Sequence, residues 1–223
     1  MPRLSNHDLI TRRLPRRVSQ LFVGLVLYGV SMAFMVESGL GLTSWDVFHQ
    51  GVAKATGISI GWAVFLTGIP ILLLWIPLRQ KPGFGTIANL VVIGFAMDGA
   101  LAVLTPGGSL SMRITYLVVG ILLNGVATGM YLGARFGPGP RDGLMTGIAH
   151  RWPRLSIRLV RTTIEILVLG IGFLLGGTIG IGTVGYALAI GPLAQLFLPI
   201  FTIPAPAAPP AAAPALPPST AIA

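Results

Sequence analysis

Two aspartates hold matching places in the two halves of the chain, and each lies where a short helix would begin. Asp46 comes three residues after Thr43, and Asp142 comes two residues after Pro140. A carboxylate there accepts hydrogen bonds from free backbone N–H groups and favours the helix dipole. If these helices dip into a membrane, the two carboxylates instead face one cavity from opposite sides, and His49 could share the site of Asp46. The two aspartates therefore predict either helix capping or a substrate or ion pathway.

Three more polar side chains lie inside long apolar segments. Asp98 and Gln195 occupy equivalent positions, and Glu165 comes one helical turn after Arg161. A charged carboxylate at membrane depth costs several kcal/mol unless it is paired or hydrated. We therefore expect Asp98, Gln195 and Glu165 to line a substrate or ion pathway. The alternative is that they join helices by polar contacts, with Arg161 neutralising Glu165.

The sequence offers no pattern of catalytic residues. Residues 180–185 match G-x-G-x-x-G, but no strand precedes them and they open an apolar segment, so a dinucleotide site fails on context. Together with residues 83–86, they are better explained as tight turns with a capping threonine. The chain has no cysteine, no H-E-x-x-H, no nucleophile elbow and no Walker sequence. We expect no enzyme activity, no metal site and no cofactor.

The candidate residues belong to an internal repeat. Seven residues recur 96 positions later: Gly24, Gly29, Val30, Gly41, Asp46, Gly51 and Ala53. Six more recur 97 positions later: Ser59, Ile60, Gly83, Gly85, Thr86 and Gly94. Each copy holds three long apolar segments, and an odd number of membrane crossings turns the second copy upside down. Such inverted repeats recur in secondary transporters.

Composition places the chain in a membrane. Hydrophobic residues make up 53% and charged residues 9% of the sequence, with a mean hydropathy of +0.83, which excludes an ordinary soluble domain. In hydrocarbon the backbone must satisfy its own hydrogen bonds, so the spans are helices. The sequence predicts an all-α polytopic membrane protein with six spans, at about 18–37, 59–78, 86–105, 114–134, 157–177 and 181–201.

The positive charge is distributed as a topology signal. Of the 15 Lys and Arg residues, 12 lie before the first span, between the second and third, or between the fourth and fifth. The positive-inside rule then puts both termini in the cytoplasm. We expect these stretches to contact anionic lipid headgroups and not nucleic acid.

The expected organisation has four parts. Residues 1–17 form a basic cytoplasmic leader, 18–105 the first repeat, 114–201 the second repeat, and 204–223 a disordered Pro/Ala tail. The longest connection within each repeat, 37–58 or 135–156, contains a short helix that is either interfacial or re-entrant. Small residues at four-residue spacing favour close helix packing, with a homodimer face as the alternative. They are Gly125, Gly129, Gly133, Gly172 and Gly176.

Four runs of residues carry a family resemblance. They lie at 39–51 (GLGLTSWDVFHQG), 56–61 (TGISIG), 79–86 (RQKPGFGT) and 137–147 (GPGPRDGLMTG). These runs resemble bacterial membrane proteins of the YczE/YyaS/YitT type, closest to the YczE-like branch. The resemblance implies a multi-pass protein of the bacterial plasma membrane, and it supplies neither a substrate nor catalytic residues.

Two functions fit these features. The inverted repeat with paired polar loops favours a small secondary transporter or permease that works by alternating access. The small size and basic cytoplasmic face fit a non-transporting scaffold or accessory protein for another membrane or export system. A lipid flippase is not separable from the transporter by sequence.

Overall fold

The computed structural model describes residues 6–203, and side chains from residue 14 onward. The expected Pro/Ala tail lies outside the described residues, as do the first residues of the expected leader. The described part contains eight helices and no strand. The helices are α1 (Asn6–Ser38), α2 (Ser44–Thr56), α3 (Ile60–Leu73), α4 (Phe84–Leu101), α5 (Leu110–Gly133), α6 (Pro140–Arg151), α7 (Ile157–Leu174) and α8 (Ile181–Phe201). The all-α prediction is therefore confirmed.

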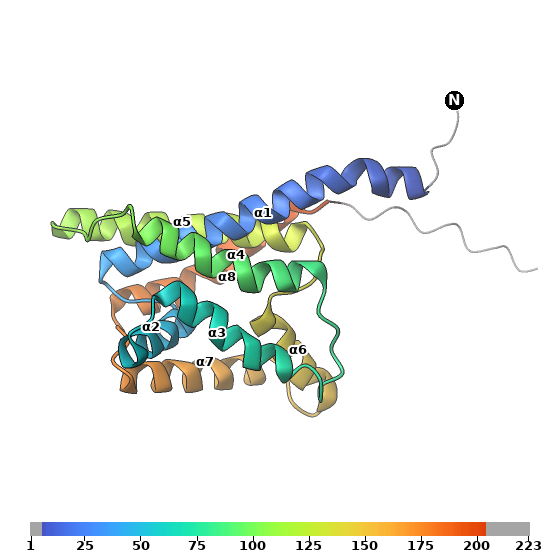
Figure 1. Cartoon of the computed structure of the whole chain (residues 1–223). Coiled ribbons are helices and arrows are strands. Elements are labelled where there is room, and N and C mark those ends of the chain that lie inside the picture. The colour runs from blue at the N-terminus through green and yellow to red at the C-terminus, as the bar shows by residue number, and fades with distance from the viewer. Residues whose placement is uncertain (1–5, 204–223) are drawn as a thin grey trace, which may run out of the picture.

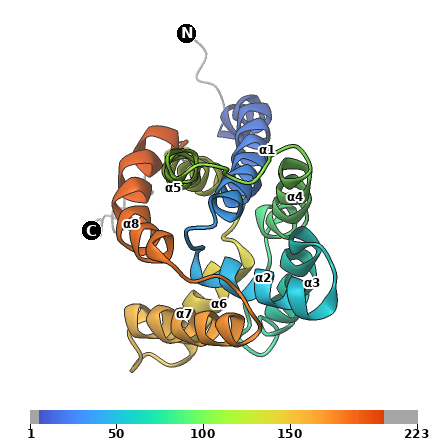
Figure 2. The same cartoon turned by 90° about the vertical axis from the view of Figure 1, so that its left-hand side faces the viewer.

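The bundle is built around an antiparallel pair, α1 and α5. Gly24 of α1 lies against Tyr131 late in α5, whereas Gly120 early in α5 lies against Met35 late in α1. Helix α4 packs on α1, and α8 packs on α5. Figure 1 shows these four helices together, with α2, α3, α6 and α7 in a second layer. Figure 2, turned by 90°, shows α4 and α8 on opposite sides of the α1–α5 pair.

Four helices are long and apolar enough to cross a membrane: α1 from Leu14, α4, α5 and α8. Helices α2 and α3, taken together, are a fifth candidate span, which is bent by 108° at their junction. Helix α7 is not among them; its 18 residues include Arg158, Arg161 and Glu165. The chain is thus a polytopic helical membrane protein with four or five candidate spans, and the six expected spans stay a prediction.

The two expected short helices are present. Thr43 precedes α2, and its Oγ1 accepts a hydrogen bond from the Asp46 N–H at 3.2 Å. Gly57 ends α2 with φ +77°, a conformation that favours glycine. Helix α6 starts at Pro140, where a missing N–H costs nothing. Figure 1 shows α2 and α6 towards opposite ends of the bundle.

Four of the five predicted packing glycines lie at helix contacts inside the chain. A Cβ added to Gly125, Gly129 or Gly133 of α5 would meet Leu193, Phe197 or Phe201 of α8 within 3 Å. This face of α5 is therefore covered by α8. On α7, Gly172 lies against the backbone of α2. Gly176 instead follows the end of α7 with φ +91°, and an added Cβ would meet only the Lys54 side chain, at 3.7 Å.

Candidate functional site

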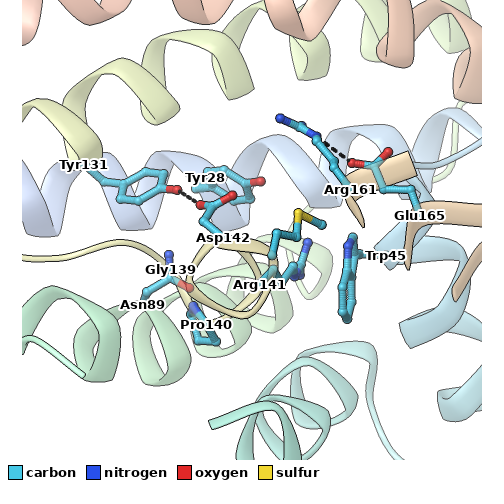
Figure 3. A pocket seen from close by; sticks show the side chains of 11 residues that line it. Tyr28, Trp45, Asn89, Tyr131, Gly139, Pro140, Arg141, Asp142, Arg161 and Glu165 are labelled. Carbon is cyan, nitrogen blue, oxygen red and sulfur yellow. Dashed lines mark hydrogen bonds and ion pairs between the residues drawn. The ribbon is translucent and has the colours of Figure 1, made fainter. Parts of the chain in front are cut away.

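A polar cavity of about 80 Å³ lies where the N-terminal ends of α2 and α6 approach each other. Its walls come from α1, α2, α4, α5, α6 and α7, and Figure 3 shows the lining side chains. A space of this size holds several water molecules or a small ion. We call it the central cavity.

Asp142 is held in the central cavity by a phenol. Its Oδ2 accepts a hydrogen bond from the Tyr131 hydroxyl at 2.8 Å. The neighbouring Arg141 places its guanidinium 5.0 Å from the centre of the Trp45 ring. Because Trp45 begins α2 and Arg141 begins α6, this cation–π contact joins the two short helices. No ion pair of Arg141 with a carboxylate is recorded among residues 14–203.

Glu165 forms the ion pair predicted with Arg161, both on α7. The Arg161 Nε lies 3.0 Å from the Glu165 Oε1, and the two side chains are 60% and 33% exposed. Such an exposed pair contributes little to stability. It does bring one more carboxylate to the wall of the central cavity.

Asp46 and His49 are on α2 with Trp45 and are almost completely buried, with 1% of each residue exposed. The Asp46 Oδ1 and the His49 Nδ1 are 3.5 Å apart. Neither atom has a hydrogen-bond partner within the described part of the chain, and the Trp45 Nε1 has none either. Buried polar atoms are nearly always satisfied, so three orphaned atoms in one place indicate a site that binds water, a proton or a small polar ligand.

The structure adds residues that the sequence analysis did not single out. Asn124 is completely buried; it donates to the Ser31 hydroxyl at 2.8 Å and accepts from the Tyr186 hydroxyl at 2.9 Å. Tyr28 and Asn89 line the central cavity. Positions 28 and 124 differ by 96 and positions 89 and 186 by 97, so each half carries one Tyr and one Asn with the types exchanged. The repeat offsets carry this signal, because they pair each Tyr with an Asn, although the paired residues are not identical.

Asp98 and Gln195 do not line the central cavity. Asp98 accepts hydrogen bonds from the Ser59 hydroxyl and, at 2.8 Å, from the Gly61 N–H, and so caps the N-terminus of α3. Gln195 is exposed on α8. The structure therefore brings Asp142 and Glu165 to the central cavity and places Asp98 and Gln195 elsewhere. Asp46 and His49 are buried next to Trp45, which lines that cavity.

A second cavity leads from the central cavity towards the start of α7. Its volume is about 310 Å³, and it shares Asp142, Met145 and Arg161 with the central cavity. Its other walls include Ile157 and Arg158, the first two residues of α7. Within residues 14–203, no group of three or more His, Cys, Asp or Glu side chains is placed to hold a metal ion.

Comparisons with known proteins agree with the membrane architecture. Residues 15–199 match a family described as a family of unknown function (DUF6198). An uncharacterized protein of Haemophilus influenzae is 43% identical over 185 residues, covering 83% of this chain and 84% of that protein. Two proteins of Bacillus subtilis also match: the uncharacterized membrane protein YczE, 29% identical over 182 residues (80% and 83% covered), and the uncharacterized protein YyaS, 28% identical over 182 residues (80% and 90% covered). The expected resemblance to YczE and YyaS is thus confirmed. No solved structure matches.

Proposed function

Since the chain belongs to the DUF6198 family of unknown function and is an integral membrane protein, we propose from its geometry that it is a small secondary transporter. In this proposal the central cavity opens alternately to the two sides of the bacterial plasma membrane. The observation that carries the proposal is a difference between two equivalent helix pairs. Helices α3 and α4 are closed against each other, whereas α7 and α8 are apart.

The order of the helices supports a duplicated unit. The first four helices correspond to the last four at the sequence offsets of 96 and 97, since α2 begins at residue 44 and α6 at 140, and α3 begins at 60 and α7 at 157. In Figure 1, α1 and α5 run in opposite directions, and so do α3 and α7, and α4 and α8. An inverted repeat with six spans accounts for both facts.

Two loop contacts recur at the same offsets. The Gly85 N–H donates to the Phe136 carbonyl at 2.9 Å, and the Gly182 N–H donates to the Leu40 carbonyl at 2.8 Å. Positions 85 and 182 are 97 apart, and positions 40 and 136 are 96 apart. Each loop therefore packs on the last helix of the other half, which ties the halves together around the central cavity.

The closed pair meets backbone to backbone. A Cβ on Gly94 of α4 would lie 2.5 Å from the Gly61 carbonyl oxygen of α3. Asp98 adds its two hydrogen bonds to Ser59 and Gly61 on the same seam. We call this contact between the start of α3 and the end of α4 the closed gate.

The equivalent contact between α7 and α8 is missing. The counterpart of Gly94 is Gly191, which has no atom within 4 Å of an added Cβ. The counterpart of Gly61 is Arg158 and that of Asp98 is Gln195, and both are exposed. Helices α7 and α8 have almost no contact with each other. We call this separation between the start of α7 and the end of α8 the open gate.

The charge distribution gives the two gates a sidedness. The second cavity reaches the open gate beside Arg158, at the end of the bundle where most of the basic loops gather. By the positive-inside rule this end is cytoplasmic, as both termini would be. The closed gate would then face outward, and the structure would correspond to an inward-open carrier. Exchanging the two gates would give the outward-open state.

Spin-label distances in lipid nanodiscs test the exchange of gates. The chain has no cysteine, so exposed positions can be labelled in pairs: Thr163 with Leu196 across the open gate, and the counterparts Leu66 with Gly99 across the closed gate. We expect two distances in each pair, because each gate is open in some molecules of the sample and closed in the others. A substitution that closes one gate should lengthen the distance across the other. A single distance in both pairs under all conditions would contradict alternating access.

A flux measurement completes the test. Proteoliposomes are loaded in turn with small cations, anions and zwitterions, and wild type is compared with Asp142→Asn. We expect one class to cross with wild type and to be retained with the variant, because Asp142 is the phenol-held carboxylate of the central cavity. If no class crosses and one partner protein co-purifies at fixed stoichiometry, the scaffold function is correct instead.

A further inference from the structure

Asp46 and Asp142 are equivalent in sequence but differ in their surroundings. Asp142 has the Tyr131 hydroxyl as a donor. The position equivalent to Tyr131 in the first half is Met35, which is completely buried and offers no hydroxyl. The first half instead has His49 where the second half has Met145. One aspartate is thus satisfied by a phenol, and the other is left beside an imidazole.

This difference leaves one buried acid–imidazole pair that can hold a proton. The Asp46 Oδ1 and His49 Nδ1 lie 3.5 Å apart with no other hydrogen-bond partner among the described residues. A protonated imidazole donates from both nitrogens, so its Nδ1–H faces the carboxylate whichever tautomer the neutral ring adopts. Away from water, the charged imidazole also attracts the carboxylate more strongly than the neutral ring does.

Several charged or titratable groups face this pair from neighbouring helices. Arg141 of α6 is close enough to interact electrostatically with His49, and Tyr28 of α1 and Tyr186 of α8 with Asp46. Asp142 of α6 and the Arg161–Glu165 pair of α7 line the central cavity together with Trp45. Lys54, at the end of α2, donates to the Gly176 carbonyl at 2.7 Å. Helix α3 carries no titratable side chain.

We propose that Asp46 and His49 form the proton-binding site of this transporter, and that binding one proton shifts the balance between its two gates. The inference rests on the proposed transport function and adds the coupling ion. Adding a proton to the pair removes its net negative charge. The charged imidazole is also repelled by Arg141, whose guanidinium joins α6 to Trp45 near the start of α2. Proton binding therefore weakens the contact between the two halves of the chain.

The first experiment measures the distance across the open gate, between α7 and α8, as a function of pH. Nanodisc samples labelled at Thr163 and Leu196 are compared between about pH 4 and pH 8, a range that covers the charge change of a buried histidine as well as an exposed one. We expect the ratio of the two distances to change by about fivefold or more, as a coupling of ordinary size would produce. Asp46→Asn and His49→Gln should each lose the pH response. His150→Gln, an exposed histidine at the end of α6, should retain it.

The second experiment observes the proton directly and leaves Asp46 and His49 unchanged, so it does not depend on the Asp46→Asn or His49→Gln variant folding. His7→Gln and His150→Gln leave His49 as the only histidine in a chain labelled with ¹⁵N-histidine. The imidazole signal of His49 should change between its neutral and charged forms with pH, in step with the distance ratio.

The outcomes separate the two proposals. Two distances with a pH-independent ratio would overturn the proton site and leave alternating access standing. A His49 signal that does not change between about pH 4 and pH 8 would do the same. A single distance at every pH would overturn alternating access and the coupling with it. A pH response that persists in both Asp46→Asn and His49→Gln would also overturn the assignment.

Discussion

The polar residues show how far a residue type predicts a role. Asp98 was predicted to line a pathway because a carboxylate at membrane depth needs a partner. Asp98 does have polar partners, which are the Ser59 hydroxyl and the Gly61 N–H at the start of α3. These partners lie 37 to 39 residues away in the chain, so the local sequence could not identify them. Gln195, at the equivalent position, has no such partner because α7 is not packed on α8.

Asp98→Ala should lower the free energy of unfolding by about 2 kcal/mol. The substitution leaves the Ser59 hydroxyl and the Gly61 N–H without their charged acceptor, and hydrogen bonds to charged groups contribute about 1.5–3 kcal/mol. Denaturation in mixed micelles, followed by circular dichroism, measures the change. Gln195→Ala is the matched control and should leave stability nearly unchanged. Equal losses in both variants would show that the capping bonds are not the cause.

Tyr131→Phe should also destabilise the protein, by about 2 kcal/mol, because Asp142 loses the hydroxyl that satisfies its Oδ2. Tyr116→Phe is the control: Tyr116 packs edge-to-face on Phe34, and its hydroxyl makes no hydrogen bond within residues 14–203. The same unfolding measurement compares the two. A loss with Tyr116→Phe as large as with Tyr131→Phe would mean that the phenol bond to Asp142 contributes nothing specific.

At the scale of helices, local signals were reliable where the cause is local. The expected turns with a capping threonine are present before α4 and α8, where the Gly83 and Gly180 N–H groups donate to the Thr86 and Thr183 hydroxyls. What the sequence could not predict is which helix each turn contacts. The loop at Phe136 packs on the start of α4 and the loop at Leu40 on the start of α8, so each turn depends on the other half of the chain.

A glycine-to-alanine substitution should affect stability differently at the equivalent positions of the two gates. Gly94→Ala should destabilise the protein by about 2 kcal/mol, because the new Cβ would lie 2.5 Å from the Gly61 carbonyl oxygen. Gly191→Ala should be neutral or slightly stabilising, since its Cβ meets no atom within 4 Å and alanine favours a helix over glycine. Unfolding measurements on both variants check the stability difference.

A larger side chain at the same place tests the motion itself. Gly191→Leu should keep the α7–α8 gate open and leave only the longer Thr163–Leu196 distance, because closing that gate requires Gly191 to meet α7 as Gly94 meets α3. Retention of both distances in Gly191→Leu would contradict a closed state built like the α3–α4 contact.

For the whole molecule, composition predicted the membrane, and the repeat predicted how the helices correspond. Composition does not fix the number of spans, because α7 carries three charged residues in 18 and the short α3 qualifies only together with α2. The difference between the gates has a partial signal in the sequence, since Gly61 and Asp98 correspond to Arg158 and Gln195. The separation of α7 from α8 could not be predicted, because it depends on contacts between helices that are distant in the chain.

Sidedness is the property of the whole molecule on which the inward-open assignment depends. Thr56 ends α2 and Arg154 follows α6, and both are exposed. Because the positive-inside rule places the basic loops in the cytoplasm, a membrane-impermeant maleimide should label Thr56→Cys in intact cells and Arg154→Cys only after permeabilisation. The cysteine-free parent chain is the control for background. Labelling of both positions from the same side would contradict the opposite placement of α2 and α6. Exchanged labelling would keep the two-gate architecture but make this conformation outward-open, with the proton site loaded from the other side.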